Sequence, residues 1–353
     1  MLPVTSPAYY RIALDVMGGD HGPHVTLLGA AMALDAMPEL YLLLVGNQAE
    51  IEPNLTRCGI QGELLGRTNI VHADSVVTMD DKATSIIKEK RNSSIRLAAE
   101  SVHKSDAHGM VSMGHTGAAM VASTMVIGKL SGVDRPCLAT ILPSFRGTPT
   151  VLLDVGANVN CKPEHIAQFA LMGAVYAKDV LGVPEPKIGV LSVGEEDAKG
   201  SEVTRRASAL LRAQDINFGG NAEGRDIWNS DFDVIACDGF VGNVVLKSSE
   251  ALAENILLGI KDSLKNNLLG RFGGLLIRPS LRKFYKKLDY AEYGGAPLLG
   301  VKGISIIGHG RSSERAVSAA IRAAVRGAKN NINDRIQKYM QHLLHTTQEI
   351  GPV

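Results

Sequence analysis

The chain has 353 residues, of which 45% are hydrophobic and 21% are charged, a composition that predicts a soluble globular protein with one large core or two closely joined halves. Its 37 basic and 36 acidic residues give a net charge of +1, so no overall field draws it to nucleic acid, and any such attraction needs a local patch. The four cysteines contain no C-x-x-C pair, which argues against a zinc ribbon or a disulfide framework and predicts buried, reduced thiols.

The N-terminal stretch MLPVTSPAYYR lacks the basic start and apolar run of a secretion signal. No apolar segment approaches the roughly 20 residues that a membrane-spanning helix needs. We therefore expect a cytoplasmic protein.

Apolar, β-branched runs recur along the chain with helical segments between them. Most are continuously apolar, as expected for strands that are covered on both faces. They therefore predict an α/β fold in three layers, with a mostly parallel sheet between helices. The runs are RIALDV (11–16), LYLLLVG (40–46), NIVHA (69–73), GMVSMG (109–114), CLATILP (137–143), TVLLDVG (150–156), KIGVLSVG (187–194), FDVIACDG (232–239) and GISIIGHG (303–310).

Six of these runs end in glycine and polar residues. Because strand ends of an open parallel sheet share one edge, where ligands bind, we expect these ends to form a common site. Glycine lets the backbone approach a ligand closely, and polar side chains can then point toward it. The ends are Asp15, Gly18, Gly19 and Asp20; Gly114, His115, Thr116 and Gly117; Asp154, Gly156 and Asn158; Gly194, Glu195 and Glu196; Asp238 and Gly239; and Gly308, His309 and Gly310.

The common catalytic motifs are missing. Gly18 and Gly19 lack the G-x-G-x-x-G spacing of a dinucleotide site, and Lys199 in GEEDAKGS stands before a glycine, whereas a P-loop lysine follows one. GVLSVG has one residue too many for a nucleophile elbow, and neither H-E-x-x-H nor a cluster of histidine and cysteine is present. These absences argue against dehydrogenase, kinase, esterase and metalloenzyme functions, and we predict neither a metal nor a cofactor.

GHTGAAMVAS passes from glycine and threonine directly into a helix, whose free N–H groups would form an anion site. Phosphate is the first anion to consider. Lys199 and Arg225 lie beside glycines, and Asn243 stands at a helix start with Lys247 one turn further on. An isolated lysine or arginine is more often a solvated surface residue, so these assignments depend on their places near strand ends.

Residues 255–290 interrupt the alternation of strands and helices. Between Lys261 and Lys287 the segment holds eight basic residues and one acid, interleaved with aliphatic and aromatic side chains. The spacing predicts a helical hairpin with an apolar tip and basic flanks, suited to a membrane surface and an acidic protein, or to a dimer interface, or to both. The expected contact residues are Arg271, Leu275, Leu276, Ile277, Arg278, Arg282, Lys283, Lys286 and Lys287.

Seven segments follow one another in order: ALDVMGGDHGP, VSMGHTGAAM, LLDVGANVNCKPEHIAQFALMG, GEEDAKGSE, EGRDI, CDGFVGNVVLK and EYGGAPLLGVKGISIIGHG. Each alone is moderate evidence, but seven in order are highly specific. Together they resemble the phosphate acyltransferase family of bacterial phospholipid synthesis, and the resemblance covers residues 11–328.

The resemblance implies transfer of a long-chain fatty acyl group from acyl carrier protein to inorganic phosphate, which gives acyl phosphate for phosphatidic acid synthesis. It also implies a homodimer without a metal, and a fold related to phosphotransacetylases and to isocitrate and isopropylmalate dehydrogenases. The product would pass to a glycerol-3-phosphate acyltransferase at the inner face of the membrane, which the basic hairpin would contact. Residues 11–328 would form the catalytic domain, with the hairpin inside it, and residues 329–353 a helical surface tail.

Attack of phosphate on a thioester needs no enzyme nucleophile, so the site must supply cations and N–H donors that hold the dianion and the oxyanion of the intermediate. We assign the charge to Lys199 and the orienting donor to Asn243, positions where the resemblance also places functional residues. The expected backbone cradle consists of Gly18, Gly19, Gly114, Thr116 and Gly117.

Other polar residues are given supporting roles. We expect Asp15, Asp20 and Asp238 to orient donors, and Asp154 and Asn158 to shape the same edge. His309, between two glycines, would either protonate the departing sulfur or hold a loop.

The chain departs from the family pattern at three positions. His115 and Ser192 stand where the family usually has asparagine, and Asn160, beside the weak candidate Lys162, stands where aspartate is usual. His115 keeps a hydrogen-bond donor but adds a group that titrates between roughly pH 5 and 8. These departures bear on the phosphate contacts more than on the reaction class.

Two other functions stay open. A short-chain phosphate acyltransferase that uses coenzyme A would share the phosphate site and need no hairpin. A non-catalytic scaffold that binds carrier protein or membrane would keep the fold, although the presence of Lys199 and Asn243 argues against it.

Overall fold

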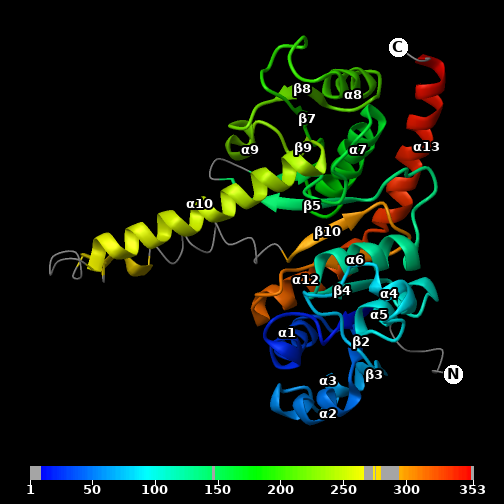
Figure 1. The fold of residues 1–353 in the computed structure, drawn as a ribbon, viewed down its shortest axis with the longest axis vertical. Coiled ribbons are helices and arrows are strands. Elements are labelled where there is room, and N and C mark those ends of the chain that lie inside the picture. The colour runs from blue at the N-terminus through cyan, green and yellow to red at the C-terminus, as the bar shows by residue number, and fades with distance from the viewer. Residues whose placement is uncertain (1–8, 145–147, 266–272, 275, 280–293, 351–353) are drawn as a thin grey trace.

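The computed structural model describes residues 9–144, 148–265, 273–274, 276–279 and 294–350. Figure 1 shows a long body built around strands, from which one helix, α10, projects. The strands are β1 (Tyr10–Asp15), β2 (Leu40–Gly46), β3 (Thr68–His72), β4 (Gly109–Ser112), β5 (Cys137–Leu142), β6 (Thr150–Leu153), β7 (Ile188–Leu191), β8 (Phe218–Ala222), β9 (Val234–Ala236), β10 (Ala296–Leu299) and β11 (Ile304–Ile307). The helices are α1 (Gly22–Ala36), α2 (Gln48–Arg57), α3 (Gly62–Gly66), α4 (Ser85–Lys88), α5 (Ser94–His103), α6 (Thr116–Ala122), the π-helix η1 (Ser123–Ile127), α7 (Pro163–Asp179), α8 (Glu202–Arg212), α9 (Asp226–Asn229), α10 (Gly239–Lys265), α12 (Glu314–Lys329) and α13 (Ile332–Ile350).

The described strands form one sheet in the order β3-β2-β1-β4-β11-β10-β5-β6-β9-β7-β8. Seven pairings are parallel, and three in the middle of the sheet, β11 with β10, β10 with β5, and β5 with β6, are antiparallel. The strand direction therefore reverses three times between β11 and β6. As a result β1, β2, β3, β4 and β11, here named the β1 set, run opposite to β6, β7, β8 and β9, here named the β6 set.

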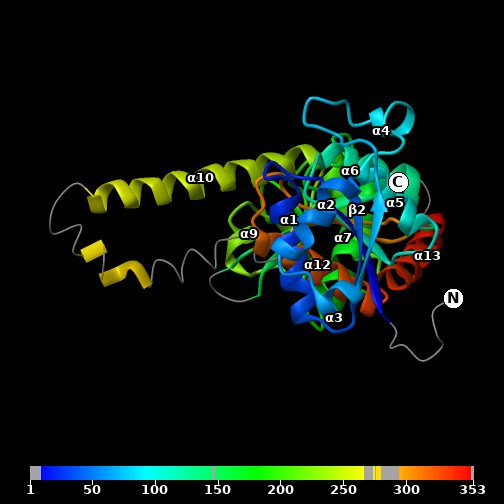
Figure 2. The same ribbon diagram turned by 90° about the horizontal axis from the view of Figure 1, so that it is seen from below.

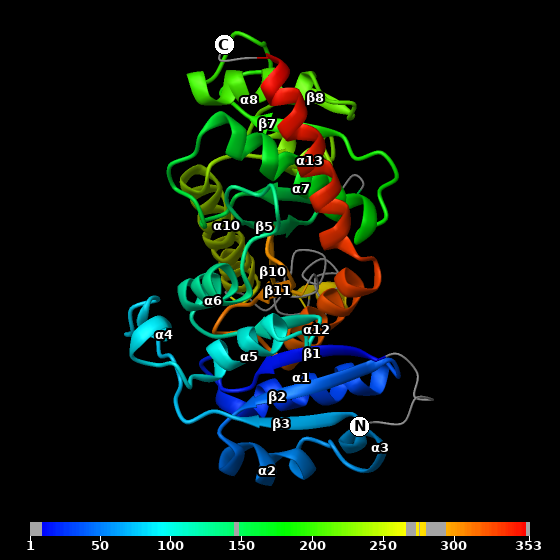
Figure 3. The ribbon, with the colours of Figure 1, turned by 90° about the vertical axis from the view of Figure 1, so that its right-hand side faces the viewer.

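Helices cover both faces of the sheet, because alternate strand residues are apolar on both sides. Ile12 and Leu14 of β1 lie in one buried cluster with residues of α1, α7, α8, α12 and α13. Ala13, between them, lies in a second cluster with residues of α5 and α6. Figure 3 shows these helices layered along the length of the sheet. The predicted three-layer α/β/α fold with a mostly parallel sheet is thus confirmed.

Each of the nine runs expected to be strands contains one, but the sequence does not predict β8 or β10. β8 reads FGGNA, and its paired glycines are more typical of a turn than of a strand. β10 reads APLL, a four-residue strand that contains a proline. Both strands are held by their neighbours in the sheet, which local sequence preference does not reveal.

Helix α10 starts at Gly239 and continues to Lys265, so the first arm of the expected hairpin begins well before residue 255. Its first turns lie against the body and the remainder projects away from it (Figures 1 and 2). Leu252, Ile256 and Leu258 on the projecting part are 62%, 51% and 57% exposed. This helix therefore presents large apolar side chains to solvent in the single chain.

Part of the expected contact surface falls on described residues. Leu276 and Ile277 are 68% and 43% exposed, and Arg278 is exposed as well. Outside the described residues lie Arg271, Leu275, Arg282, Lys283, Lys286 and Lys287. In the described part of the chain, no helix is both long and apolar enough to cross a membrane.

Helix α13 packs against α7, which corrects the expectation of a surface helix for its first half. Ile332, Ile336 and Met340 are at most 2% exposed and belong to the main core cluster. Nη1 of Arg335 also lies 2.6 Å from Oδ1 of Asp179 at the end of α7. The segment that follows residue 328 is therefore anchored to the body through buried apolar contacts.

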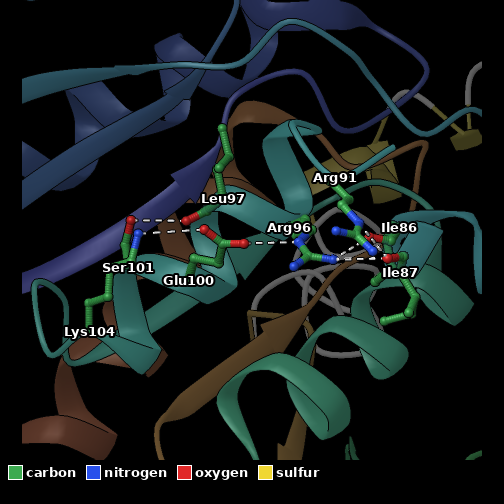
Figure 4. A network of polar contacts seen from close by, with 8 residues as sticks. All are labelled: Ile86, Ile87, Arg91, Arg96, Leu97, Glu100, Ser101 and Lys104. Atoms are coloured by element: carbon green, nitrogen blue, oxygen red, sulfur yellow. Dashed lines mark hydrogen bonds and ion pairs between the residues drawn. The ribbon is translucent and has the colours of Figure 1, made fainter. Parts of the chain in front are cut away.

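A polar network ties α5 to the neighbouring α4 (Figure 4). Arg96 donates to Glu100 through Nε (2.9 Å) and to the carbonyl oxygen of Ile86 through Nη1 (2.7 Å). Lys104 lies 3.6 Å from the other oxygen of Glu100. These contacts position the segment between β3 and α5. This segment contacts His115, at the start of α6, through the carbonyl oxygen of Asp81.

Candidate functional site

A cavity of about 310 Å³ opens beside β10 and β5, the two strands that lie between the β1 set and the β6 set. Its walls come from β5, β10, the end of β11, the loop after β6, and the first turns of α6 and α10. The lining residues are Thr116, Leu138, Thr140, Ile141, Val155, Asn243, Leu246, Lys247, Glu250, Gly295, Ala296, Ile307, Gly308 and His309. Two larger hollows, one beside Tyr9 and Tyr41 and one beside α7 and α13, are lined by none of the predicted site residues.

The loops after β1, β4 and β11 pack tightly against one another near this cavity. A Cβ on Gly18 would lie 2.8 Å from the backbone N of Gly114, and the backbone N of Asp20 donates to the carbonyl oxygen of Gly310 at 2.8 Å. Gly19 has a φ of +103°, a left-handed conformation that glycine adopts without strain. Close packing between loops thus explains these glycines, while their expected role as a phosphate cradle stays a prediction.

Asp15 lies beneath these loops and is 2% exposed. Ser112 donates through Oγ to Oδ2 of Asp15 (2.7 Å), and the same Oγ accepts from the backbone N of Gly114 (3.2 Å). Burial raises the pKa of Asp15, opposed in part by hydrogen bonds from Ser94 and Ser112. The carboxyl therefore orients a serine and its loop, in keeping with the supporting role expected for it.

His115 caps helix α6, and both of its ring nitrogens are occupied. Nδ1 accepts from the backbone N of Ala118 (3.2 Å), and Nε2 donates to the carbonyl oxygen of Asp81 (3.1 Å). These partners require the neutral ring with its proton on Nε2. Both nitrogens thus have protein partners, and the expected contact of His115 with phosphate stays a prediction. Thr116, the next residue, is exposed and lines the cavity.

Asp154 joins three elements beside the cavity and is fully buried. Oδ1 accepts from the backbone N of Leu138 (2.9 Å) in β5 and of Ala157 (3.1 Å), and Oδ2 accepts from the backbone N (2.6 Å) and Nδ2 (2.9 Å) of Asn158. Burial raises the pKa of Asp154, and these donors partly offset that rise. The carbonyl oxygen of Asn158 in turn accepts from the backbone N of Gly239, where α10 begins (2.8 Å). Asp154 and Asn158 therefore hold this side of the cavity together from buried positions.

The start of α10 is held close to the same loop. Asp238 accepts through Oδ1 from the backbone N of Val241 (2.9 Å), which caps the helix. A Cβ on Gly242 would clash with the carbonyl oxygen of Asp154, so glycine permits this close approach. The helix thereby brings the exposed side chain of Asn243 to the rim of the cavity. Its Oδ1 lies 3.7 Å from the position that a Cβ on Gly156 would occupy.

Two other predicted residues stand at the rim. Lys247 lies 2.8 Å from Oε2 of Glu250, so its charge is paired within the helix. His309 is exposed, and its Nδ1 lies 3.5 Å from the backbone N of Arg311. The ring therefore belongs to a turn and also lines the cavity, which leaves both of its expected roles in place.

Lys199 and Arg225 lie outside the cavity lining. Arg225 pairs with Glu195, with Glu223 (3.3 Å) and with Asp226 (3.8 Å), and the hydrogen bond with Glu195 raises its pKa further. Its charge is thus paired with acids, and the expected contact of Arg225 with phosphate stays a prediction. Lys199 is exposed and forms no ion pair with any residue that the structure describes, so its ammonium is available to an anion.

The prediction of one shared edge is wrong, because the β1 and β6 sets run in opposite directions. Four of the six strand ends nevertheless contribute to the cavity, those after β4, β6, β9 and β11. The loop after β1 lies against the loops after β4 and β11. The loop after β7, which contains Lys199, does not line the cavity. The cavity joins the two sets across the antiparallel strands β5 and β10.

Sequence reasoning missed the apolar part of this cavity. Leu138, Val155, Leu246 and Ile307 line it but belong to runs that predict only strands or a helix face, and Ala296 lies in β10, which the sequence does not predict. No local motif distinguishes them from core residues, since only the meeting of β5, β10, β11 and α10 places them together.

The cysteines and possible metal ligands supply no further chemistry at this site. Cys58, Cys137 and Cys237 are buried free thiols, and burial raises the pKa of the half-buried Cys161 to about 11. Thiolate is therefore scarce at neutral pH. Across the described ranges, no group of three or more histidine, cysteine, aspartate or glutamate side chains is placed to hold a metal.

Residues 10–335 match a family model described as "Fatty acid synthesis protein". The chain is 44% identical over 331 residues to the phosphate acyltransferase of Geobacter sulfurreducens, an alignment that covers 94% of each protein. It is similar in fold to a phosphotransacetylase from Streptococcus pyogenes, with a TM-score of 0.61 at 15% identity over 91% of this chain and 94% of the other. A 4-hydroxythreonine-4-phosphate dehydrogenase from Klebsiella pneumoniae gives a TM-score of 0.50 at 14% identity over 91% and 99%.

Proposed function

The chain belongs to the fatty acid synthesis protein family and is an acyltransferase, and we propose that it transfers a long-chain fatty acyl group from acyl carrier protein to inorganic phosphate. The name of its curated relatives supports phosphate as the acceptor. The product of this reaction, an acyl phosphate, would then serve phosphatidic acid synthesis.

In the proposed reaction, a phosphate oxygen attacks the thioester carbonyl carbon. A new C–O bond forms, the carbonyl oxygen becomes an oxyanion in the tetrahedral intermediate, and the C–S bond then breaks to release the thiolate of the carrier. Because phosphate is itself the nucleophile, the protein has to orient it and stabilise the oxyanion. It needs no nucleophilic side chain for this.

Asn243 is the donor that best fits the oxyanion. Its amide stands at the rim of the cavity, on a helix start that Asp154, Asn158 and Asp238 hold by hydrogen bonds. A donor that is fixed before the reaction stabilises developing charge without reorganising. Lys199, whose ammonium has no partner in the described residues, would supply the charge that gathers phosphate from the neighbouring loop.

One cavity combines a buried apolar floor, formed by Leu138, Val155 and Ile307, with the amide of Asn243 at its rim, and this combination is the main support for the proposed reaction. An acyl thioester has the same two parts, a hydrocarbon chain and a polar reacting group. A scaffold without catalysis would have no need for this pairing.

The proposal extends to partners and place in the cell. We expect a cytoplasmic homodimer that meets the inner face of the membrane through the hairpin expected at residues 255–290 and delivers acyl phosphate to a glycerol-3-phosphate acyltransferase. The exposed apolar residues Leu276 and Ile277 beside Arg278 support contact with an anionic membrane surface.

One assay tests the proposed reaction. The protein is incubated with palmitoyl acyl carrier protein and phosphate, and acyl phosphate is trapped with hydroxylamine as the hydroxamate. Phosphate-dependent hydroxamate supports the proposal, and its absence overturns it. The same assay with acetyl and palmitoyl coenzyme A distinguishes the short-chain alternative, which predicts faster turnover of acetyl coenzyme A.

A further inference from the structure

The cavity between the two strand sets separates apolar from polar residues. At its floor, Leu138, Val155 and Ile307 are 6%, 2% and 3% exposed and belong to the same buried cluster. At its rim, Thr116, Asn243 and His309 are exposed, and so is Lys247, which pairs with Glu250. Among the residues that the structure describes, no charged side chain lines the floor.

This separation indicates where in the cavity each of the two proposed substrates, the acyl thioester and phosphate, would bind. A phosphate dianion at the floor would lose its hydration and gain no cation and only the hydroxyl of Thr140 as a side-chain donor, which is strongly unfavourable. A hydrocarbon chain would instead release water from apolar walls, which is favourable. The floor therefore suits the acyl chain, and the rim suits the thioester and the phosphate.

We propose that this cavity is the acyl-chain site and that Ala296 sets the length of chain it accepts. The inference rests on the proposed function and deepens it. Ala296 lies in β10 opposite Ile307 of β11 and packs against the same apolar cluster as the floor. Apart from glycine it has the smallest side chain in the lining, so it leaves space that a larger residue would fill.

The size of the cavity makes this position sensitive. Its volume of about 310 Å³ is at the lower end of the range of about 300 to 1,000 Å³ found for small-molecule sites. A larger side chain at 296 would remove a large share of it. Since one methylene changes specificity by about tenfold or more in an apolar pocket, the preference between chain lengths should respond strongly.

The test uses Ala296→Phe and the milder Ala296→Leu, with Ala174→Phe as a matched control. Ala174 lines the separate hollow beside α7 and α13, so the same change there leaves the cavity intact. For each protein, kcat/KM is measured with palmitoyl and octanoyl acyl carrier protein. We expect the ratio of palmitoyl to octanoyl activity to fall at least tenfold in Ala296→Phe, less in Ala296→Leu, and not in Ala174→Phe.

A binding measurement keeps this inference separate from the proposed function. Fluorescence of cis-parinaric acid should rise on binding to the wild type and to Ala174→Phe, and rise much less with Ala296→Phe, in proteins that retain the wild-type melting temperature. If Ala296→Phe is misfolded, Ala296→Leu decides. An unchanged chain-length ratio together with unchanged parinaric acid binding overturns the acyl-chain site. If the wild type turns over no acyl donor, the proposed function fails and the binding measurement alone decides whether the cavity takes a fatty chain.

Discussion

Oδ2 of Asp154 accepts two hydrogen bonds from Asn158, one from its backbone N at 2.6 Å and one from its Nδ2 at 2.9 Å. Nδ2 of Asn158 also donates to the carbonyl oxygen of Pro136 (2.8 Å), and its own carbonyl oxygen receives the first backbone N–H of α10. One buried carboxyl thus links the start of β5, the loop after β6 and the helix that carries Asn243. The position of the proposed oxyanion donor depends on this link.

Substitution Asp154→Asn should destabilise the fold by about 3 kcal/mol, because an amide NH₂ would face N–H donors that now meet a carboxyl oxygen. The free energy of unfolding in urea measures this loss. Asp231→Asn, at an exposed position, is the control and should change stability by no more than about 0.5 kcal/mol. A stability equal to that of the control would show that the four hydrogen bonds to Asp154 contribute little.

Local pattern predicts the layers of this fold but not the geometry of its site. Continuous apolar runs identify nine strands because burial on both faces leaves a direct record in the sequence. The geometry of the middle of the sheet leaves none. There β10, a short proline-containing strand from near the end of the chain, pairs antiparallel with both β11 and β5, and the antiparallel pair β5 and β6 reverses the second strand set. Strand β10 also supplies Ala296 to the cavity. The residue types of His115 and Arg225 suggest ligands, but the sequence does not show that Asp81 and Glu195 already accept from their side chains, because these partners are distant in the chain.

Asn243→Ala and Lys199→Ala should each lower kcat/KM by a factor of about 150, since loss of one oxyanion donor typically costs on the order of 3 kcal/mol in the barrier. Both side chains are exposed, so the melting temperature should stay close to that of the wild type. Asn255→Ala, an exposed position further along α10, is the matched control and should retain full activity. Near-normal rates in both Asn243→Ala and Lys199→Ala would remove these two assignments.

His115→Asn should preserve both stability and turnover, whereas His115→Ala should lose about 1 kcal/mol of stability. Asparagine can still cap α6 by accepting from the backbone N of Ala118, and alanine cannot. Because the ring does not face the cavity, the KM for phosphate should change little in either variant. A large increase in the KM for phosphate in His115→Asn, at unchanged stability, would indicate that His115 contacts phosphate.

Asp81 provides a stability difference that depends on pH. Its hydrogen bond with Lys90 (2.6 Å), helped by those from Thr78, lowers the pKa of Asp81 from 3.8 to about 2. A carboxyl with a lowered folded pKa stabilises the fold when ionised, so its contribution is fully present above pH 3.8 and is lost as the pH falls toward 2. The difference in melting temperature between the wild type and Asp81→Asn should therefore be constant near neutral pH and shrink in that acidic range.

The segment expected to form a hairpin should bind membrane through the exposed apolar residues that follow α10. Leu276 and Ile277 are 68% and 43% exposed beside Arg278, so insertion of their side chains would remove apolar surface from water while the cation meets anionic headgroups. Leu276→Ser combined with Ile277→Ser should lower sedimentation with phosphatidylglycerol liposomes at least tenfold and leave turnover of soluble acyl carrier protein unchanged. Leu252→Ser with Ile256→Ser changes exposed residues of α10 nearer the body and separates the two explanations of the apolar surface. If neither pair affects liposome binding but the second pair dissociates a dimer in analytical ultracentrifugation, the hairpin serves subunit association and the membrane proposal is wrong.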